Sequence, residues 1–213
     1  MLRIGLFLCL AVCLLALIGQ SLAWQGQFSI DPSRLAVGNV LVSMRELPDP
    51  NFTDTVVVLT HYDSKGTVGL ILNRRSTIRL SRLFPEIKDP KRQQETVFQG
   101  GPVTPTGIMA LLQARVKPEG ATKILNGIFL VNDSKLLEKS LATPGGNDDL
   151  RVYLGYAGWG PGQLERESGL GAWFIFPGNT QLIFDPNPGS LWPRLIHRTE
   201  LRYALNLSRP SGI

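Results

Sequence analysis

A repeated alternation of short apolar runs with turn residues constrains the fold more than any other feature of the sequence. From Gly38 onward, runs rich in Val, Ile and Leu are separated by Gly, Pro, Asn and Asp, a pattern typical of strands joined by tight turns. The chain has 22 glycines and 15 prolines in 213 residues, above their roughly 12% combined average. We therefore expect strands at residues 40–42, 55–59, 67–72, 96–98, 107–112, 127–131 and 150–156.

Helical spacing is confined to a few short segments. Leu80, Leu83 and Phe84 fall at i, i+3 and i+4, with Ser76 and Thr77 as candidate N-caps. We also expect a short helix capped by Asp133, a helix from near Ser190, and a hairpin joining residues 173–176 to 181–184. The sequence predicts a β-rich α+β fold, with an extended lead-in at 24–37 and a single domain at 38–213.

The first 23 residues have the pattern of a secretory signal peptide. Arg3 precedes a 15-residue apolar run at 4–18, and Ser21-Leu22-Ala23 resembles a processing site. An uncleaved anchor is the alternative, but a membrane span needs about 20 apolar residues. We therefore expect export to the periplasm or the exterior, with no membrane span after cleavage. Both cysteines, Cys9 and Cys13, lie in this segment, so the mature chain would have no disulfide and no thiol chemistry.

Motifs of catalysis and metal binding are missing from the sequence. It contains no nucleophile elbow, phosphate-binding loop, dinucleotide fingerprint or zinc-protease motif. His61 and His197 are far apart in the sequence, and no mature cysteine could join them as a metal ligand. A triad through His61 stays open, but a hydrogen-bonded residue at a strand end is the favoured interpretation. We expect no catalytic residue, no metal and no cofactor, and the balance is against an enzyme.

Two polar segments flank the strands expected at 55–59 and 67–72. Asp49 and Asn51 belong to a proline-rigid loop whose Phe52 is expected in the core, or else the two polar side chains face a pocket. Asn73 and Arg74 follow the second of these strands. Arg74 could clamp an anionic ligand or pair with a structural carboxylate, because its guanidinium offers a planar fork of donors.

A loose basic cluster follows Arg74. It lacks interleaved aromatic residues, so its nucleic-acid signal is weak. A solvated face is the default interpretation. Its members are Arg75, Arg79, Arg82, Lys88, Lys91 and Arg92.

The densest stretch of glycines and polar residues is 154–167. A strand enters a glycine-rich turn, and Pro161 takes a first helical position. Gln163 and Glu167 should share one helix face, with Glu165 directed elsewhere. One interpretation is a structural strand–turn–helix corner; the other is a pocket that includes Gly162, Gln163 and Glu165.

Six motifs in register resemble the YqgE/AlgH family over residues 38–192. They are Asp49-Pro50-Asn51-Phe52, the strand leading to His61, Gly69-Leu70-Ile71-Leu72-Asn73-Arg74, Gly100-Gly101-Pro102-Val103, Gly155-Tyr156-Ala157-Gly158-Trp159 with Gly162-Gln163-Leu164-Glu165-x-Glu167, and Gly171-Ala172-Trp173 with Trp192. The resemblance implies a bifurcated, mostly antiparallel sheet curled into a pseudo-barrel, with a few flanking helices. It brings no established reaction or cofactor. The segment after Trp192 departs from the pattern, and most relatives look cytoplasmic.

Three functional hypotheses follow. The leading one is an exported, non-catalytic binding or interaction module. The second is a small-anion-binding enzyme that uses a carboxylate and arginine pocket. The third is a transcriptional regulator, as the family name suggests, which requires that the leader is not used. The sequence specifies neither a partner nor an oligomeric state. The residues of the hypothetical ligand site are Asp49, Asn51, Asn73, Arg74, Gly162, Gln163 and Glu165.

Overall fold

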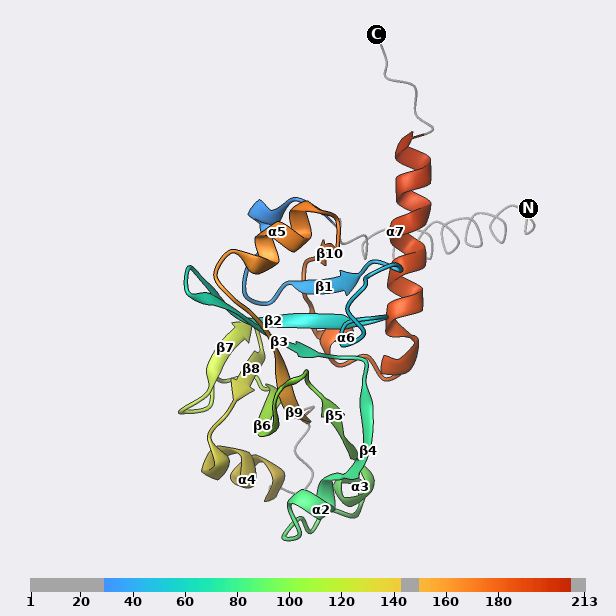
Figure 1. Ribbon diagram of the computed structural model, residues 1–213. Coiled ribbons are helices and arrows are strands. Elements are labelled where there is room, and N and C mark those ends of the chain that lie inside the picture. Colours follow the sequence, from blue (N-terminus) through green and yellow to red (C-terminus); the bar gives the residue numbers. More distant parts are fainter. Residues whose placement is uncertain (1–28, 143–149, 208–213) are drawn as a thin grey trace, which may run out of the picture.

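The computed structural model describes residues 29–142 and 150–207, with side chains described as far as residue 201. The predicted signal peptide and the start of the lead-in lie outside these residues. Ten strands form one branched sheet (Figure 1). The first branch contains β10 (Trp173–Phe176), β1 (Val40–Ser43), β2 (Val56–Asp63) and β3 (Gly66–Ile71), in that order. The second contains β6 (Val103–Gln113), β8 (Ile128–Val131) and β7 (Thr122–Leu125), with β4 (Arg75–Arg79) and β5 (Thr96–Gln99) on a side arm.

The long strand β9 (Leu150–Trp159) belongs to both branches. Its last residues pair with β3, where Thr67 lies opposite Trp159, and its earlier residues pair with β6, where Leu112 lies opposite Leu150. β9 pairs with β5 in the parallel direction, and every other pair among the described strands is antiparallel. The sheet does not close on itself. This arrangement confirms the predicted α+β fold with a bifurcated, mostly antiparallel sheet.

Two glycines permit the branch at β9. Gly101 (φ +154°) and Gly155 (φ +67°) both have positive φ. A Cβ at Gly101 would lie 2.2 Å from the backbone carbon of Tyr156, and one at Gly155 would lie 2.4 Å from the carbonyl oxygen of Gly101. Any side chain at either position would push the chain between β5 and β6 away from β9.

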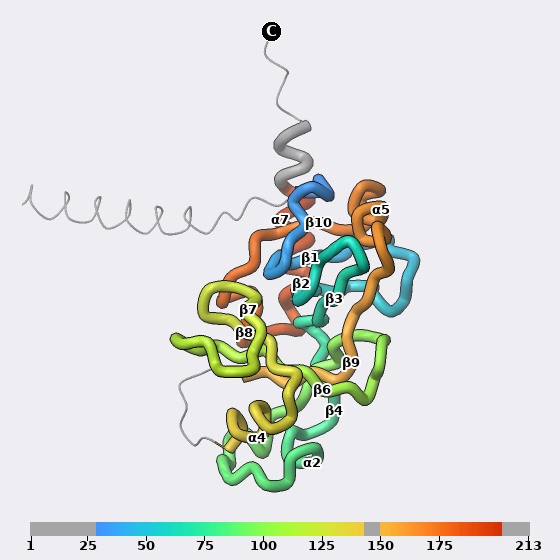
Figure 2. Tube along the Cα trace, turned by 90° about the vertical axis from the view of Figure 1, so that its left-hand side faces the viewer, coloured from blue at the N-terminus to red at the C-terminus, as the bar shows by residue number. Residues whose placement is uncertain are grey.

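The helices flank the two branches (Figures 1 and 2). At the far end of the second branch lie α2 (Leu80–Leu83), α3 (Pro90–Gln94) and α4 (Ser134–Ala142). The 3-10 helix η1 (Pro32–Arg34) and α5 (Gln163–Gly169) pack together beside the first branch, which α7 (Leu191–Leu207) also borders through β1. The remaining short elements are α6 (Thr180–Ile183) and η2 (Pro188–Ser190). Among the described helices, none is both long and apolar enough to cross a membrane.

Three apolar clusters form the core. One joins the sheet to α6 and α7 and includes Trp192, and a second lies beneath α2 and α4 and includes Leu137. The third lies between the first branch and α5, where Phe52, Trp159 and Trp173 meet. Val56 to Leu59 are all fully buried, as expected for a strand covered on both faces.

The expectations for residues 181–184 and for the N-cap of α2 were wrong. Residues 180–183 form the helix α6 and not a hairpin strand, because the Asn179 side chain accepts a hydrogen bond from the Leu182 N–H (3.0 Å) and caps a helical turn. Ser76 and Thr77 do not cap α2; they belong to β4, and the N-cap residue of α2 is Arg79, which makes no capping bond with its side chain.

Candidate functional site

The loop before β2 is held by the arginine that follows β3. Arg74 donates from Nη1 to the carbonyl oxygen of Asn51 (2.6 Å) and from Nη2 to that of Thr53 (2.9 Å). Both acceptors are backbone carbonyls, and neither bond goes to a carboxylate. Partial burial lowers the pKa of Arg74, while the nearby charges of Asp54 and Asp49 oppose that shift. The guanidinium therefore fixes the loop.

Asn73 fixes the same loop through both ends of its amide. Its Oδ1 accepts from the Val56 N–H (2.9 Å), and its Nδ2 donates to the Asp54 carbonyl (2.8 Å). Asp49 makes a local turn by accepting from the Asn51 N–H (2.8 Å), while the Asn51 side chain is exposed. The structure thus brings Asp49, Asn51, Asn73 and Arg74 together at the start of β2.

Phe52 carries this loop into the core. Its ring stacks on Trp159 (centroids 5.6 Å apart, planes at 19°) and meets Trp173 edge-on (5.7 Å, 75°). Only 9% of Phe52 is exposed, which confirms its expected place in the core. The aromatic trio is completed by an edge contact between the two indoles (5.9 Å).

Glu167 is the polar centre of this aromatic cluster. Its Oε2 accepts from the indole Nε1 of Trp159 (3.0 Å) and of Trp173 (2.9 Å), and its Oε1 accepts from Gln163 Nε2 (2.8 Å). Gln163 in turn accepts from the Gly160 N–H (3.0 Å). The predicted shared helix face of Gln163 and Glu167 is confirmed.

The role of Glu167 was missed at the sequence level, although a signal for it existed. Trp159 and Trp173 are buried, and a buried indole N–H normally finds an acceptor. Two tryptophans occur in the same set of motifs as a short helix that carries acidic residues. This combination indicates that one carboxylate accepts hydrogen bonds from both indoles.

The side chain of Glu165 points to a different side of α5 from those of Gln163 and Glu167, as expected. Its Oε1 accepts a hydrogen bond from the hydroxyl of Tyr62 (2.9 Å). Burial, and secondly this bond to Glu165, raise the pKa of Tyr62 above its ordinary value. Gly162 is the N-cap of α5 with φ +67°. Pro161 therefore precedes the helix, and its expected first helical position was wrong.

The seven expected site residues form two groups. Asp49, Asn51, Asn73 and Arg74 surround the loop before β2, whereas Gly162, Gln163 and Glu165 belong to the start of α5. No hydrogen bond or ion pair joins the groups within the described part of the chain. They are connected through Phe52, Trp159 and Glu167.

The remaining candidates for chemistry lie apart from this cluster. His61 is exposed and pairs through Nε2 with Asp63 Oδ2 (3.1 Å), the hydrogen-bonded strand-end residue that we favoured. Within residues 29–142 and 150–207, no three His, Cys, Asp or Glu side chains are grouped to hold a metal ion.

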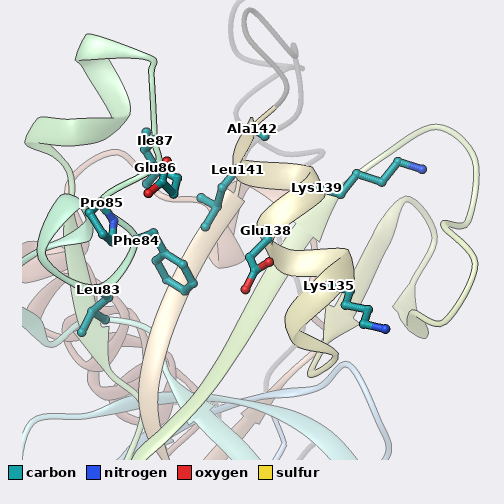
Figure 3. Close-up of a pocket in the computed structure, with 10 residues that line it drawn as sticks. All are labelled: Leu83, Phe84, Pro85, Glu86, Ile87, Lys135, Glu138, Lys139, Leu141 and Ala142. Atoms are coloured by element: carbon teal, nitrogen blue, oxygen red, sulfur yellow. The ribbon is translucent and has the colours of Figure 1, made fainter.

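A cavity of about 420 Å³ opens between α4 and the segment that includes the end of α2 (Figure 3). Leu83, Phe84 and Ile87 line one side, and Leu141 lines the other. Figure 3 shows Leu141 and Glu138 extending from α4 toward Phe84. Sequence reasoning missed this cavity because its two walls are separated by almost fifty residues of chain.

Comparisons with known proteins agree on one family. A family model described as AlgH-like (DUF179) matches residues 40–204 and thus extends past Trp192. A UPF0301 protein of Streptomyces avermitilis is 34% identical over 185 residues, covering 81% of this chain and 91% of its own. A UPF0301 protein of Anaeromyxobacter is 32% identical over 182 residues, covering 80% of this chain and 90% of its own.

Two solved structures resemble the fold. The solution structure of the AlgH protein from Pseudomonas aeruginosa has a TM-score of 0.63 at 27% identity and covers 83% of this chain and 95% of its own. A crystal structure of a Corynebacterium diphtheriae protein has a TM-score of 0.65 at 24% identity and covers 78% of this chain and 87% of its own.

Proposed function

The chain belongs to the AlgH-like DUF179 family, and from this premise we propose that it is an exported, non-catalytic binding or interaction module. The observation that carries the proposal is that polar atoms of the motif residues are hydrogen-bonded within the protein. Glu167 accepts three hydrogen bonds from neighbouring side chains, and Arg74 donates two to loop carbonyls. Motif residues engaged in this way stabilise a scaffold.

A small-anion-binding enzyme fits these contacts less well. Such a site would need Arg74 and Glu165 to converge with free donors and acceptors. Arg74 instead holds Asn51 and Thr53, and Glu165 accepts from Tyr62. The pairing of these groups supports binding through another surface.

Export is proposed from the leader alone. A basic residue, an apolar run and a small-residue site are the features of a signal peptide. The regulator alternative requires the protein to remain in the cytoplasm, where it can reach chromosomal DNA. Fractionation of cells and sequencing of the mature N-terminus separate the two: a chain that begins at Trp24 outside the cytoplasm supports export, and a full-length cytoplasmic chain contradicts it.

Turnover assays test the absence of catalysis. The purified protein is incubated with chromogenic esters, phosphate esters and glycosides, beside the variants Glu165→Gln and His61→Ala. We expect no release of chromophore above buffer for any of the three proteins. Reproducible turnover that either substitution abolishes would show that the protein is an enzyme.

A further inference from the structure

The positive charge of the protein is concentrated in one segment. Residues 75–95 contain six Lys and Arg against three Asp and Glu, so they carry +3 of the chain's formal net charge of +5. The structure folds this segment into β4, which runs along the side arm, and into α2 and α3 at the far end of the second branch (Figure 1). Its exposed cations, which we name the basic edge, are Arg75, Arg79, Arg82, Lys88 and Lys91.

The backbone of β4 is a poor template for a further strand. Among the strands that the structure describes, β4 pairs with β5 alone, and the register slips between Arg75 and Arg79. In this slip the Ser76 hydroxyl accepts from the Ile78 N–H (3.0 Å). Irregular, positively charged edges discourage strand addition. A partner would therefore contact the side chains of this edge.

Arg92 is a further cation of this segment, on α3. It is only 9% exposed, and within the described residues its side chain makes no hydrogen bond or ion pair. A buried guanidinium without an anion is unfavourable.

The apolar cavity adjoins the same segment. Arg82 directly precedes the wall formed by Leu83 and Phe84. On the other wall, Lys135 and Lys139 are exposed on α4 and extend away from Phe84 (Figure 3). A concave apolar site with cations on both flanks suits a ligand that combines an apolar group with negative charge.

We propose that the cavity and the basic edge together form a docking surface for an acidic protein segment that inserts an apolar side chain between α2 and α4. The inference rests on the proposed binding function and names its surface and class of partner. Acidic residues beside the anchor would reach the basic edge on one side and the α4 lysines on the other. This pairing steers and orients the partner.

Two carboxylates favour a protein segment over a nucleic acid. Glu86 and Glu138 also line the cavity, so they interrupt the positive surface that a continuous phosphate backbone would need. A nucleic acid also lacks an aliphatic or phenyl side chain to fill the space between Phe84 and Leu141. A peptide can place an apolar residue there and its acidic residues elsewhere.

The first test is direct binding of a labelled peptide to the full protein, measured by fluorescence anisotropy. The probe is a peptide of about twelve residues in which glutamates and serines flank one central phenylalanine. We expect saturable binding that weakens as salt rises. The triple variant Arg75→Glu/Arg79→Glu/Arg82→Glu should lose at least about tenfold in affinity. The matched reversal of three exposed cations elsewhere, Arg115→Glu/Lys117→Glu/Lys123→Glu, should change it little.

The second test concerns the cavity. Ala142→Trp fills it from the end of α4, and a probe with serine in place of phenylalanine leaves it empty. Each change should weaken binding several-fold, and the two together should weaken it little further. Glu138→Gln should keep or increase affinity, because it removes a negative charge that faces the acidic probe. Loss of affinity in Glu138→Gln would contradict an acidic ligand.

Other outcomes overturn the inference without touching the proposed function. Equal affinity of the two triple variants, or tighter binding of a duplex DNA or of vesicles with anionic lipid than of the peptide, would exclude an acidic protein segment. Because turnover is measured separately, an inactive protein without peptide binding would still be a candidate binding module with a different surface.

Discussion

Single residues of the aromatic cluster carry a measurable part of the stability. Glu167→Ala would leave the buried indole N–H groups of Trp159 and Trp173 without their acceptor. We expect a loss of about 3 kcal/mol in the free energy of unfolding, since each unpaired buried donor costs about 1–3 kcal/mol. Urea denaturation followed by tryptophan fluorescence measures it directly.

Two companion variants make the Glu167 result specific. Glu167→Gln keeps an acceptor and should lose about 1 kcal/mol, while Glu119→Ala removes an exposed carboxylate and should stay within about 0.5 kcal/mol of wild type. Equal losses for Glu167→Ala and Glu119→Ala would mean that the indole hydrogen bonds do not stabilise the fold.

At the scale of elements, the turn from β9 into α5 depends on one glycine. Gly162 is the N-cap of α5 in a left-handed conformation, with φ +67°. Gly162→Ala should cost about 1 kcal/mol of stability because an L side chain strains this region. Gly160→Ala is the matched control, since its Cβ would meet only Gln163 Oε1 at 3.8 Å. Similar melting temperatures for the two variants would argue against strain at Gly162.

The attachment of α7 should depend on pH. Glu200 on α7 accepts a bidentate pair of hydrogen bonds from Arg45, whose guanidinium also lies 5.5 Å from the ring centroid of Trp192. The bond from Arg45 holds the pKa of Glu200 below its ordinary value of 4.5. A lowered folded-state pKa means that this stabilisation is present above pH 4.5 and is lost as the pH falls further.

Glu200→Gln isolates that contribution. Thermal unfolding midpoints of wild type and variant should differ at neutral pH and converge as the pH falls below about 4. A difference that stays constant across this range would show that the carboxylate of Glu200 does not stabilise α7 through its charge.

Elements with regular patterns were predictable from the sequence, and those set by tertiary contacts were not. The apolar runs gave β2 and β3, and the spacing of Leu137 and Leu141 gave α4. β4 was missed because its polar sequence forms a strand only by pairing with β5. The residues of α6 were expected to form a strand because apolar residues there have high β-propensity. The Asn179 side chain instead caps a helical turn.

The candidate site shows the same division. Local chemistry predicted that Phe52 is buried and that Gln163 and Glu167 share a face. It could not predict that Arg74 reaches Asn51 and Thr53, because two strands separate these residues in the sequence. Hydrogen bonds across such distances follow from topology and not from spacing.

For the whole molecule, the proposed account separates two sets of residues. Phe52, Asn73, Trp159, Glu167 and Trp173 of the family motifs meet at the aromatic cluster and the loop before β2, where their polar atoms hold the first branch together. The basic edge and the cavity lie on β4, α2, α3 and α4, beside a different apolar cluster that includes Leu80 and Leu137. The account therefore predicts that stability and binding can be changed independently.

Adjacent arginines provide the most direct test of this separation. Arg74→Gln and Arg75→Gln each remove one positive charge, and the two are compared for urea unfolding and for affinity toward the acidic peptide. Arg74→Gln should lose about 1–2 kcal/mol of stability and keep its affinity. Arg75→Gln should bind about threefold more weakly and lose only about 0.5 kcal/mol of stability, since its guanidinium lies 5.2 Å from the Phe98 ring centroid. If the folded Arg74→Gln protein loses binding while Arg75→Gln keeps it, the motif residues are the binding site and the account is contradicted.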